Sequence, residues 1–223
     1  LHQLVRPAAL RHVEQQRPGG VGYVAAGRSR EAQVPAILEL YDIPCTFSDP
    51  LVCAATLDKA VAKRLVVSAG LATPAFAVVS APVDIGRVKL RFPAFAKPIA
   101  EGTGKGIDTD SRVDSRAALD RVCKRLLKKH HQPVLVEEFL PGREFTVGIL
   151  GTGRDARAIG TTEVVIKDAS LKSIYSFKAK EECDELVEYF YPSRGRLRAA
   201  VEKLALDSYR ALECRDAGRV DIR

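Results

Sequence analysis

The sequence predicts a mixed α/β (α+β) protein rather than a doubly wound parallel sheet. Helix-like stretches are interspersed with short strand-like runs, several of which follow one another directly and so favour antiparallel pairing. The strict alternation of strand and helix that marks a doubly wound fold does not occur. The 223 residues are enough for a real hydrophobic core and for one or two domains.

A long helix is expected over residues 48–70, with Gly70 at a position typical of a C-cap. A short helix is also expected from Glu31. The apolar stripe that predicts the helix over 48–70 repeats at four-residue steps: Leu57, Val61, Leu65 and Ala69.

Two further helices are expected along the chain. Residues 114–129 are amphipathic, and Asp114 or Ser115 can cap their first turn. Residues 194–214 carry an apolar face, which consists of Leu197, Val201, Leu204, Ser208 and Leu212.

Strand-like runs fill the remaining ordered parts of the sequence. The turn PGRE at 141–144 is expected to join two of these runs as a hairpin, and a domain boundary is expected near residue 133. Pro98 is expected to end its strand. The runs cover residues 43–47, 71–80, 92–98, 133–140, 144–151, 156–166 and 217–223.

Composition excludes several classes of protein. Hydrophobic residues make up 46% and charged residues 28% of the chain, which is typical of a soluble globular protein. No apolar run reaches the roughly 20 residues of a membrane span, so we expect no membrane partner. The five cysteines form no CxxC pair, which favours reduced thiols in a cytoplasmic protein. The chain has no methionine and stops within an expected strand, which we interpret as the mark of a fragment.

The net charge of +7 is compatible with nucleic acid, but also with an anionic small ligand. Basic residues are dispersed and aromatic residues amount to 6%, so a surface for stacking on single strands is poorly supported. We therefore expect no nucleic-acid partner and favour an anionic small molecule.

The stretch AKPIAEGTGKGID at 96–108 is typical of a loop that approaches phosphate. It fails the Walker pattern, because Ile99 stands where glycine is needed and Gly106 where serine or threonine is needed. It fails the dinucleotide fingerprint as well, since no helix opens on the glycines. A glycine-rich hairpin can still lay backbone N–H groups over phosphates, with Lys97 held beside them in the strand. The alternative, a surface hairpin flanked by lysines, stays open on this stretch alone.

Residues further along favour a nucleotide. Strand alternation puts Glu144 on one face with Thr146 and Gly148, where a carboxylate could take the hydroxyls of a ribose. Arg219 and Asp221 also share one side of a strand, where they could hold an anion and a divalent metal together. A surface ion pair is the alternative for these last two.

Taken in order, these segments resemble the ATP-grasp superfamily, and within it the D-alanine:D-alanine ligase family. FAKPIAEGTGKGI resembles the lysine strand and phosphate loop, and VEEFLPGREFTVGIL resembles the adenine hinge with its following strand. YSFKAKEEC resembles the mobile loop with its lysine, and CRDAGRVDIR the strand with the catalytic arginine and a magnesium carboxylate. The resemblance covers roughly residues 28–223.

The resemblance implies an ATP-grasp fold, in which two α+β subdomains grip ATP between antiparallel sheets behind a partial N-terminal α/β domain. The implied units are residues 1–55, a partial substrate domain; 56–133, a central subdomain with the phosphate loop; and 134–223, an incomplete C-terminal subdomain. The implied activity joins two amino acids through an acylphosphate, as in peptidoglycan precursor synthesis, with ATP and Mg²⁺ (or Mn²⁺). Alternatives are another ATP-grasp amino-acid or dipeptide ligase and a truncated nucleotide-binding protein without ligase activity. Such ligases are often dimers, so a homodimer is one candidate assembly.

The resemblance also implies roles for single residues. Arg219 would stabilise the tetrahedral intermediate, Asp221 would bind magnesium, and Lys180 would hold phosphate from the closing loop. Three departures from the family are visible. The family's longer N-terminal part, whose glycine-rich loop and glutamate help to bind the first D-alanine, is missing or unreadable here. Glu181 stands where an aromatic residue is common, and the chain ends before the Glu and Asn that complete the magnesium site. The remaining implied ATP contacts are Lys59, Lys97, Glu101, Gly102, Thr103, Gly104, Glu137, Glu138, Phe139, Leu140 and Glu144.

Overall fold

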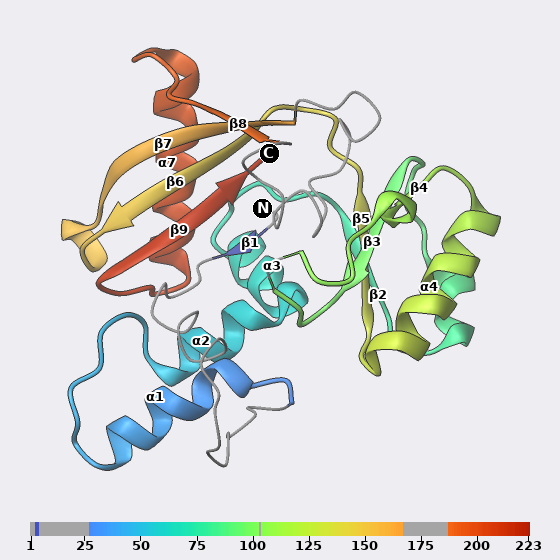
Figure 1. Cartoon of the computed structure of the whole chain (residues 1–223), viewed down its shortest axis with the longest axis horizontal. Coiled ribbons are helices and arrows are strands. Elements are labelled where there is room, and N and C mark those ends of the chain that lie inside the picture. Colours follow the sequence, from blue (N-terminus) through green and yellow to red (C-terminus); the bar gives the residue numbers. More distant parts are fainter. Residues whose placement is uncertain (1–2, 5–26, 103, 167–186) are drawn as a thin grey trace.

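The computed structural model describes residues 3–4, 27–102, 104–166 and 187–223, and these build two antiparallel sheets with helices packed on them (Figure 1). The strand order is β1-β9-β6-β7-β8 in the five-stranded sheet and β2-β5-β3-β4 in the four-stranded sheet. The α+β class expected from the sequence is therefore confirmed. Within the described part of the chain, no helix is both long enough and apolar enough to cross a membrane.

Helix α4 (Arg116–His130) covers one face of the four-stranded sheet, and Ser115 caps it by accepting a hydrogen bond from the N–H of Ala118. Strand alternation turns Ala94 and Ala96 toward this helix and Phe95 and Lys97 to the other face. The strands of this sheet are β2 (Phe76–Val79), β3 (Ala94–Pro98), β4 (Arg112–Val113) and β5 (Val134–Glu138).

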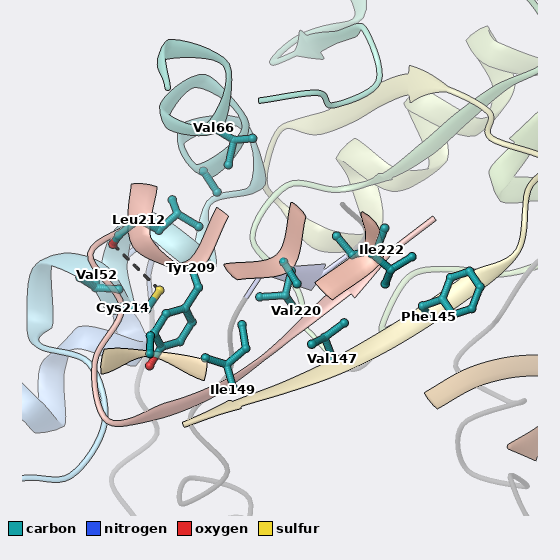
Figure 2. Close-up of a cluster of buried hydrophobic side chains, with 14 residues drawn as sticks. Val52, Val66, Phe145, Val147, Ile149, Tyr209, Leu212, Cys214, Val220 and Ile222 are labelled. Carbon is teal, nitrogen blue, oxygen red and sulfur yellow. Dashed lines mark hydrogen bonds between the residues drawn. The ribbon is translucent and has the colours of Figure 1, made fainter. Parts of the chain in front are cut away.

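Helix α7 (Arg196–Ala211) covers one face of the five-stranded sheet, and its Tyr209 lies in the core shown in Figure 2. Val147 and Val220 point into the same core, so the residues that alternate with them face away from α7. The strands are β1 (Gln3–Leu4), β6 (Glu144–Leu150), β7 (Arg157–Ile166), β8 (Val187–Phe190) and β9 (Ala217–Ile222).

Helix α3 (Lys59–Ser68) links the two cores. Its residues Ala62 and Val66 pack into the α7 core, whereas Ala60 packs with Ile99 and Leu135 against the four-stranded sheet. Because one helix contributes to both clusters, it fixes the two sheets relative to each other. The other helices in the described residues are α1 (Arg30–Leu40) and α2 (Pro50–Leu57), with 3₁₀ turns at Pro82–Arg87, Thr109–Ser111 and Gly153–Asp155.

The single helix expected over residues 48–70 is in fact two helices. Asp58 has an extended backbone and its carboxylate accepts hydrogen bonds from the N–H groups of Ala60 and Val61, so a new helix begins there. The break shifts the buried face, and Leu65 of the expected stripe is 39% exposed. The expected stripe is therefore wrong. The buried residues of α3 are Ala60, Ala62, Lys63 and Val66.

The hairpin expected at PGRE is also wrong. Strand β5 lies between β2 and β3, and β6 lies between β9 and β7, so neither has an edge left to pair with the other. Residues 139–143 instead carry the chain from one sheet to the other. The transition between the two sheets thus follows Glu138. The strand expected at 43–47 does not form.

Candidate functional site

The two sheets meet at a set of charged residues that both helices α4 and α7 leave uncovered. Arg223, at the C-terminal end between the sheets, lies over the ring of Phe139 with its guanidinium carbon 5.3 Å from the centroid (Figure 1). Arg223 also forms an ion pair with Glu144 across 3.6 Å. The segment after β5 and the start of β6 are thereby joined to the end of β9.

Lys97 and Glu137 form the most buried part of the site. Phe95 is the direct cross-strand partner of Glu137, so Lys97 lies diagonally from Glu137 on the same sheet face. The Lys97 ammonium donates to Glu137 Oε1 at 2.5 Å, and the two side chains are 1% and 3% exposed. Lys63 of α3 contacts the other carboxylate oxygen, Oε2, at 2.9 Å. One carboxylate therefore bridges two buried ammonium groups.

Burial lowers the pKa of Lys97 below its ordinary value, because a charged ammonium loses its hydration there. The charge of Glu137 and its hydrogen bond act against this shift, and Glu144 also raises the pKa. The charge of Lys63 lowers it further. Lys97 is thus a desolvated cation, which is the kind of group that gains most from an incoming anion.

Arg219 and Asp221 lie on the uncovered face of the five-stranded sheet, as their spacing predicts. Arg219 Nε is 3.2 Å from Asp221 Oδ1, and Thr146 on β6 donates its hydroxyl to the same oxygen at 2.9 Å. The register explains the contact, because Thr146 is the cross-strand partner of Asp221. The Arg219 side chain is 41% exposed, so it can turn toward a ligand.

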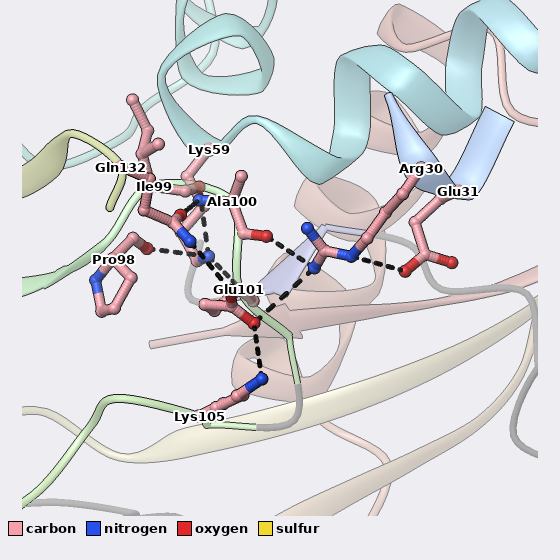
Figure 3. Close-up of polar contacts among 9 residues, drawn as sticks. All are labelled: Arg30, Glu31, Lys59, Pro98, Ile99, Ala100, Glu101, Lys105 and Gln132. Carbon is pink, nitrogen blue, oxygen red and sulfur yellow. Dashed lines mark hydrogen bonds and ion pairs between the residues drawn. The ribbon is translucent and has the colours of Figure 1, made fainter. Parts of the chain in front are cut away.

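The base of the glycine-rich loop is held by side chains from three other segments (Figure 3). The Lys59 ammonium donates to the carbonyls of Pro98, Ile99 and Glu101 at 3.2, 3.2 and 2.5 Å. These carbonyls belong to the last residue of β3 and to residues just after it, so Lys59 fixes the point where the loop leaves the sheet.

Arg30 and Gln132 complete this anchoring network. Arg30 Nη2 donates to the carbonyl of Ala100 at 2.7 Å and lies 3.7 Å from Glu101 Oε2. Gln132 donates to Glu101 Oε1 at 2.8 Å and accepts from the N–H of Ala100 at 2.7 Å. Side-chain hydrogen bonds therefore hold the backbone at residues 98–101, where the glycine-rich loop begins.

Glycine is required at the far side of the loop. Gly104 and Gly106 have φ values of +82° and +79°, in the left-handed region that favours glycine. A Cβ at Gly106 would lie 2.5 Å from Pro98 Cγ and 2.8 Å from His130 Nε2. This packing partly buries His130, and burial lowers its pKa below 6.5.

Most of the residues expected at the site lie where the sheets meet or at the loop. Glu138 is the last residue of β5 and Phe139 follows it, and their N–H groups donate to the carbonyls of Ala75 and Pro93 at 3.0 and 3.2 Å. Leu140 follows them and is partly buried, and Gly102 and Gly104 belong to the loop. Thr103 and Lys180 lie outside the described residues.

Sequence reasoning missed Lys63. The available signal was its position four residues after Lys59 in DKAVAK, which places both lysines on one helix face. The continuous helix expected over residues 48–70 has a different buried stripe, and Lys63 is not part of it.

A metal ion would have to take most of its ligands from elsewhere. Among the residues that the structure describes, no three His, Cys, Asp or Glu side chains lie together as a metal site. Asp221 could supply one carboxylate, and its side chain is 7% exposed. This donor set fits magnesium, which often binds through one or two carboxylates with water and substrate phosphates.

Comparison with known proteins gives the same family from sequence and from structure. The family described as "D-ala D-ala ligase C-terminus" matches residues 65–223. A D-alanine–D-alanine ligase of Bordetella avium is 34% identical over 196 residues, which is 86% of this chain and 59% of the relative. That of Aquifex aeolicus is 32% identical over 209 residues, covering 93% of this chain and 67% of the relative.

Solved structures agree. The D-Ala:D-Ser ligase VanG of Enterococcus faecalis superposes with a TM-score of 0.69 at 25% identity, over 86% of this chain and 55% of that one. The D-alanine–D-alanine ligase of Bacillus anthracis, solved in complex with ATP, gives a TM-score of 0.65 at 20% identity, over 86% and 59%. The chain thus spans less than two thirds of the first relative and of these solved structures. It belongs to the D-alanine–D-alanine ligase family, and its paired antiparallel sheets are those of the ATP-grasp fold.

Proposed function

We propose that this protein is an ATP-dependent carboxylate–amine ligase that joins two amino acids through an acylphosphate, with D-alanine as the first candidate substrate. One observation carries the proposal. A buried lysine–glutamate cluster on one sheet and a partly exposed Arg219–Asp221 pair on the other converge where the sheets meet. Family membership supports D-alanine, since the relatives that match most of this chain are D-alanine–D-alanine ligases.

The four-stranded sheet would bind the nucleotide. Lys97 supplies a desolvated positive charge for the phosphates, and backbone N–H groups at Gly102 and Gly104 lie in a loop that can cover them. The segment from Glu138 to Leu140 would contact the adenine edge. Glu144, which is held by Arg223, would accept the ribose hydroxyls.

The five-stranded sheet would carry the reacting carboxylate. Arg219 is positioned to neutralise the negative charge that develops when an amine attacks the acylphosphate. Asp221 would hold a magnesium ion together with the phosphates, and that ion would offset phosphate charge when bound. Lys180 is assigned to the phosphates by resemblance alone. The work of the protein in this scheme is positioning, charge neutralisation and exclusion of water.

The experiment is a substrate screen on the purified protein. Incubation with Mg²⁺-ATP and amino acids, singly and in pairs, should release phosphate only when a joinable pair is present, and mass spectrometry should detect the dipeptide. D-alanine with itself is the expected pair, and D-alanine with D-serine tests another ligase specificity. If no amino acid stimulates phosphate release while ATP still binds, the protein is a nucleotide-binding protein without ligase activity.

Lys97→Ala should abolish ATP binding in this assay, because it removes the buried cation. The matched control is Lys203→Ala, which removes a lysine that is 77% exposed and paired with Asp207. Activity retained in Lys97→Ala would contradict the assignment of this site.

A further inference from the structure

Lys63 is a buried cation that the proposed reaction does not use. It lies on α3 with 2% of its side chain exposed, although lysines are almost never fully buried without a partner. Its ammonium contacts Glu137 Oε2 at 2.9 Å and donates to the Thr73 hydroxyl at 2.6 Å. It also lies 5.3 Å from the centroid of the Phe76 ring. This environment holds the ammonium in one place.

The charges around Glu137 are unequal in number. Two ammonium groups, on Lys63 and Lys97, contact one carboxylate, and each contacts a different oxygen. One lysine would already balance Glu137, so the second ammonium group is a further buried charge, which is costly to desolvate even though Glu144 also acts on Lys97.

The excess charge is useful if an anion approaches Lys97. An ammonium has three donor hydrogens, so Lys97 can turn part of its hydrogen bonding toward a phosphate. As it does so, its contact with Glu137 weakens. If Lys63 were absent, the buried carboxylate of Glu137 would then lose most of its compensating positive charge. Lys63 remains on Oε2 throughout, because the ion pair itself and the position of its helix α3 hold it there.

We infer that Lys63 is a positioning residue for nucleotide binding, acting as the fixed counter-ion of Glu137 that allows Lys97 to be shared with a phosphate of ATP. The inference rests on the proposed function, since it needs ATP as the ligand. Lys63 itself need not touch the nucleotide. Its effect passes through Glu137, and this dependence is what an experiment can isolate.

The test is calorimetric titration of ATP with Mg²⁺ into the full chain and its variants. Lys63→Met keeps most of the side-chain volume and removes the charge, and it should weaken ATP binding by at least about tenfold, the worth of one charged hydrogen bond. Thr73→Val is the matched control, because it removes a neutral partner of Lys63 and leaves all three charges in place. It should change ATP affinity by less than about threefold.

A double variant separates positioning from packing. If Lys63 acts through Glu137, then Lys63→Met combined with Glu137→Gln should bind ATP as well as Glu137→Gln alone. The double variant buries one ammonium group fewer than Glu137→Gln alone, so it should fold wherever Glu137→Gln folds. A further loss of affinity in the double variant would overturn the inference.

The pH profile gives a second readout. The groups facing Lys97 are Glu137 from β5, Lys63 from α3 and Glu144 from β6, and Lys63 is the one whose charge lowers the pKa of Lys97. ATP affinity should fall at alkaline pH as Lys97 loses its proton. In Lys63→Met that fall should move to higher pH, whereas a purely structural role would leave it in place.

The outcomes for the two proposals differ. If the unaltered chain does not bind ATP, the proposed function fails. If it binds ATP and Lys63→Met binds equally well with the same pH profile, the inference on Lys63 fails and the proposed function stands.

Discussion

Each of the two sheets carries a pair of opposite charges close together, but the two pairs differ in how deeply they are buried. On the four-stranded sheet, Lys97 and Glu137 are 1% and 3% exposed and lie under α3. On the five-stranded sheet, Asp221 is 7% exposed whereas its partner Arg219 is 41% exposed. A buried pair is costly to separate and holds its geometry, whereas a half-exposed arginine can move at little cost. The first arrangement suits binding, and the second suits a group that must respond to a reaction.

The difference between the two pairs should be largest in the free energy of unfolding when the carboxylate of each pair is removed. Glu137→Ala leaves two buried ammonium groups without their carboxylate and should lower the free energy of unfolding by about 3–5 kcal/mol. Asp221→Ala should cost only about 1 kcal/mol, because Arg219 can then be hydrated. Urea denaturation with an unchanged m value would measure both. Equal losses would show that burial does not distinguish the two pairs.

Arg219→Ala should produce the opposite pattern, a loss of activity without a comparable loss of stability. Removing a donor that stabilises transition-state charge lowers kcat by roughly 10²–10³-fold. ATP affinity should change little, since the proposed nucleotide contacts lie mainly on the other sheet. Steady-state kinetics combined with ATP titration would check this. A raised Kd for ATP with unchanged kcat would instead assign Arg219 to nucleotide binding.

The smallest expected effect concerns His130, at the end of α4 beneath the glycine-rich loop. Burial lowers the folded-state pKa of His130 below its ordinary value of 6.5. At a pH between the folded-state pKa and 6.5, the unfolded chain therefore binds more protons than the folded chain. The free energy of unfolding should therefore fall as pH drops below about 6.5, and this contribution should level off below the folded-state pKa. Denaturation at a series of pH values would show it.

His130→Leu should flatten that part of the stability profile. His131→Leu is a suitable control, because His131 is exposed and follows the helix as its C-cap. An identical acid profile in the unaltered chain and in His130→Leu would show that this imidazole does not contribute to the pH dependence.

Local patterns in the sequence predicted several features correctly. The spacing of Arg219 and Asp221 by two residues puts them on one face wherever a strand forms, and Ser115 can cap a helix with a hydrogen bond that spans three residues. Pro98 likewise ends its strand. These features depend on contacts within a few residues, so no knowledge of the fold was needed.

Other features depended on partners distant in the sequence. PGRE has the composition of a tight turn, yet β5 and β6 already have neighbours on both sides and cannot pair. Asp58 was not recognised as a helix start, and the phase of α3 was wrong in consequence.

The sequence by itself determined the α+β class, the glycine-rich loop after Lys97 and the shared strand face of Arg219 and Asp221, because backbone periodicity and side-chain chemistry act over short distances. Only the tertiary structure decided that Lys63 meets Glu137, which is 74 residues away along the chain. Burial makes that contact significant, since the same two charges on a hydrated surface would interact weakly. Their placement depends on how α3 packs against the four-stranded sheet, and no local pattern encodes that packing.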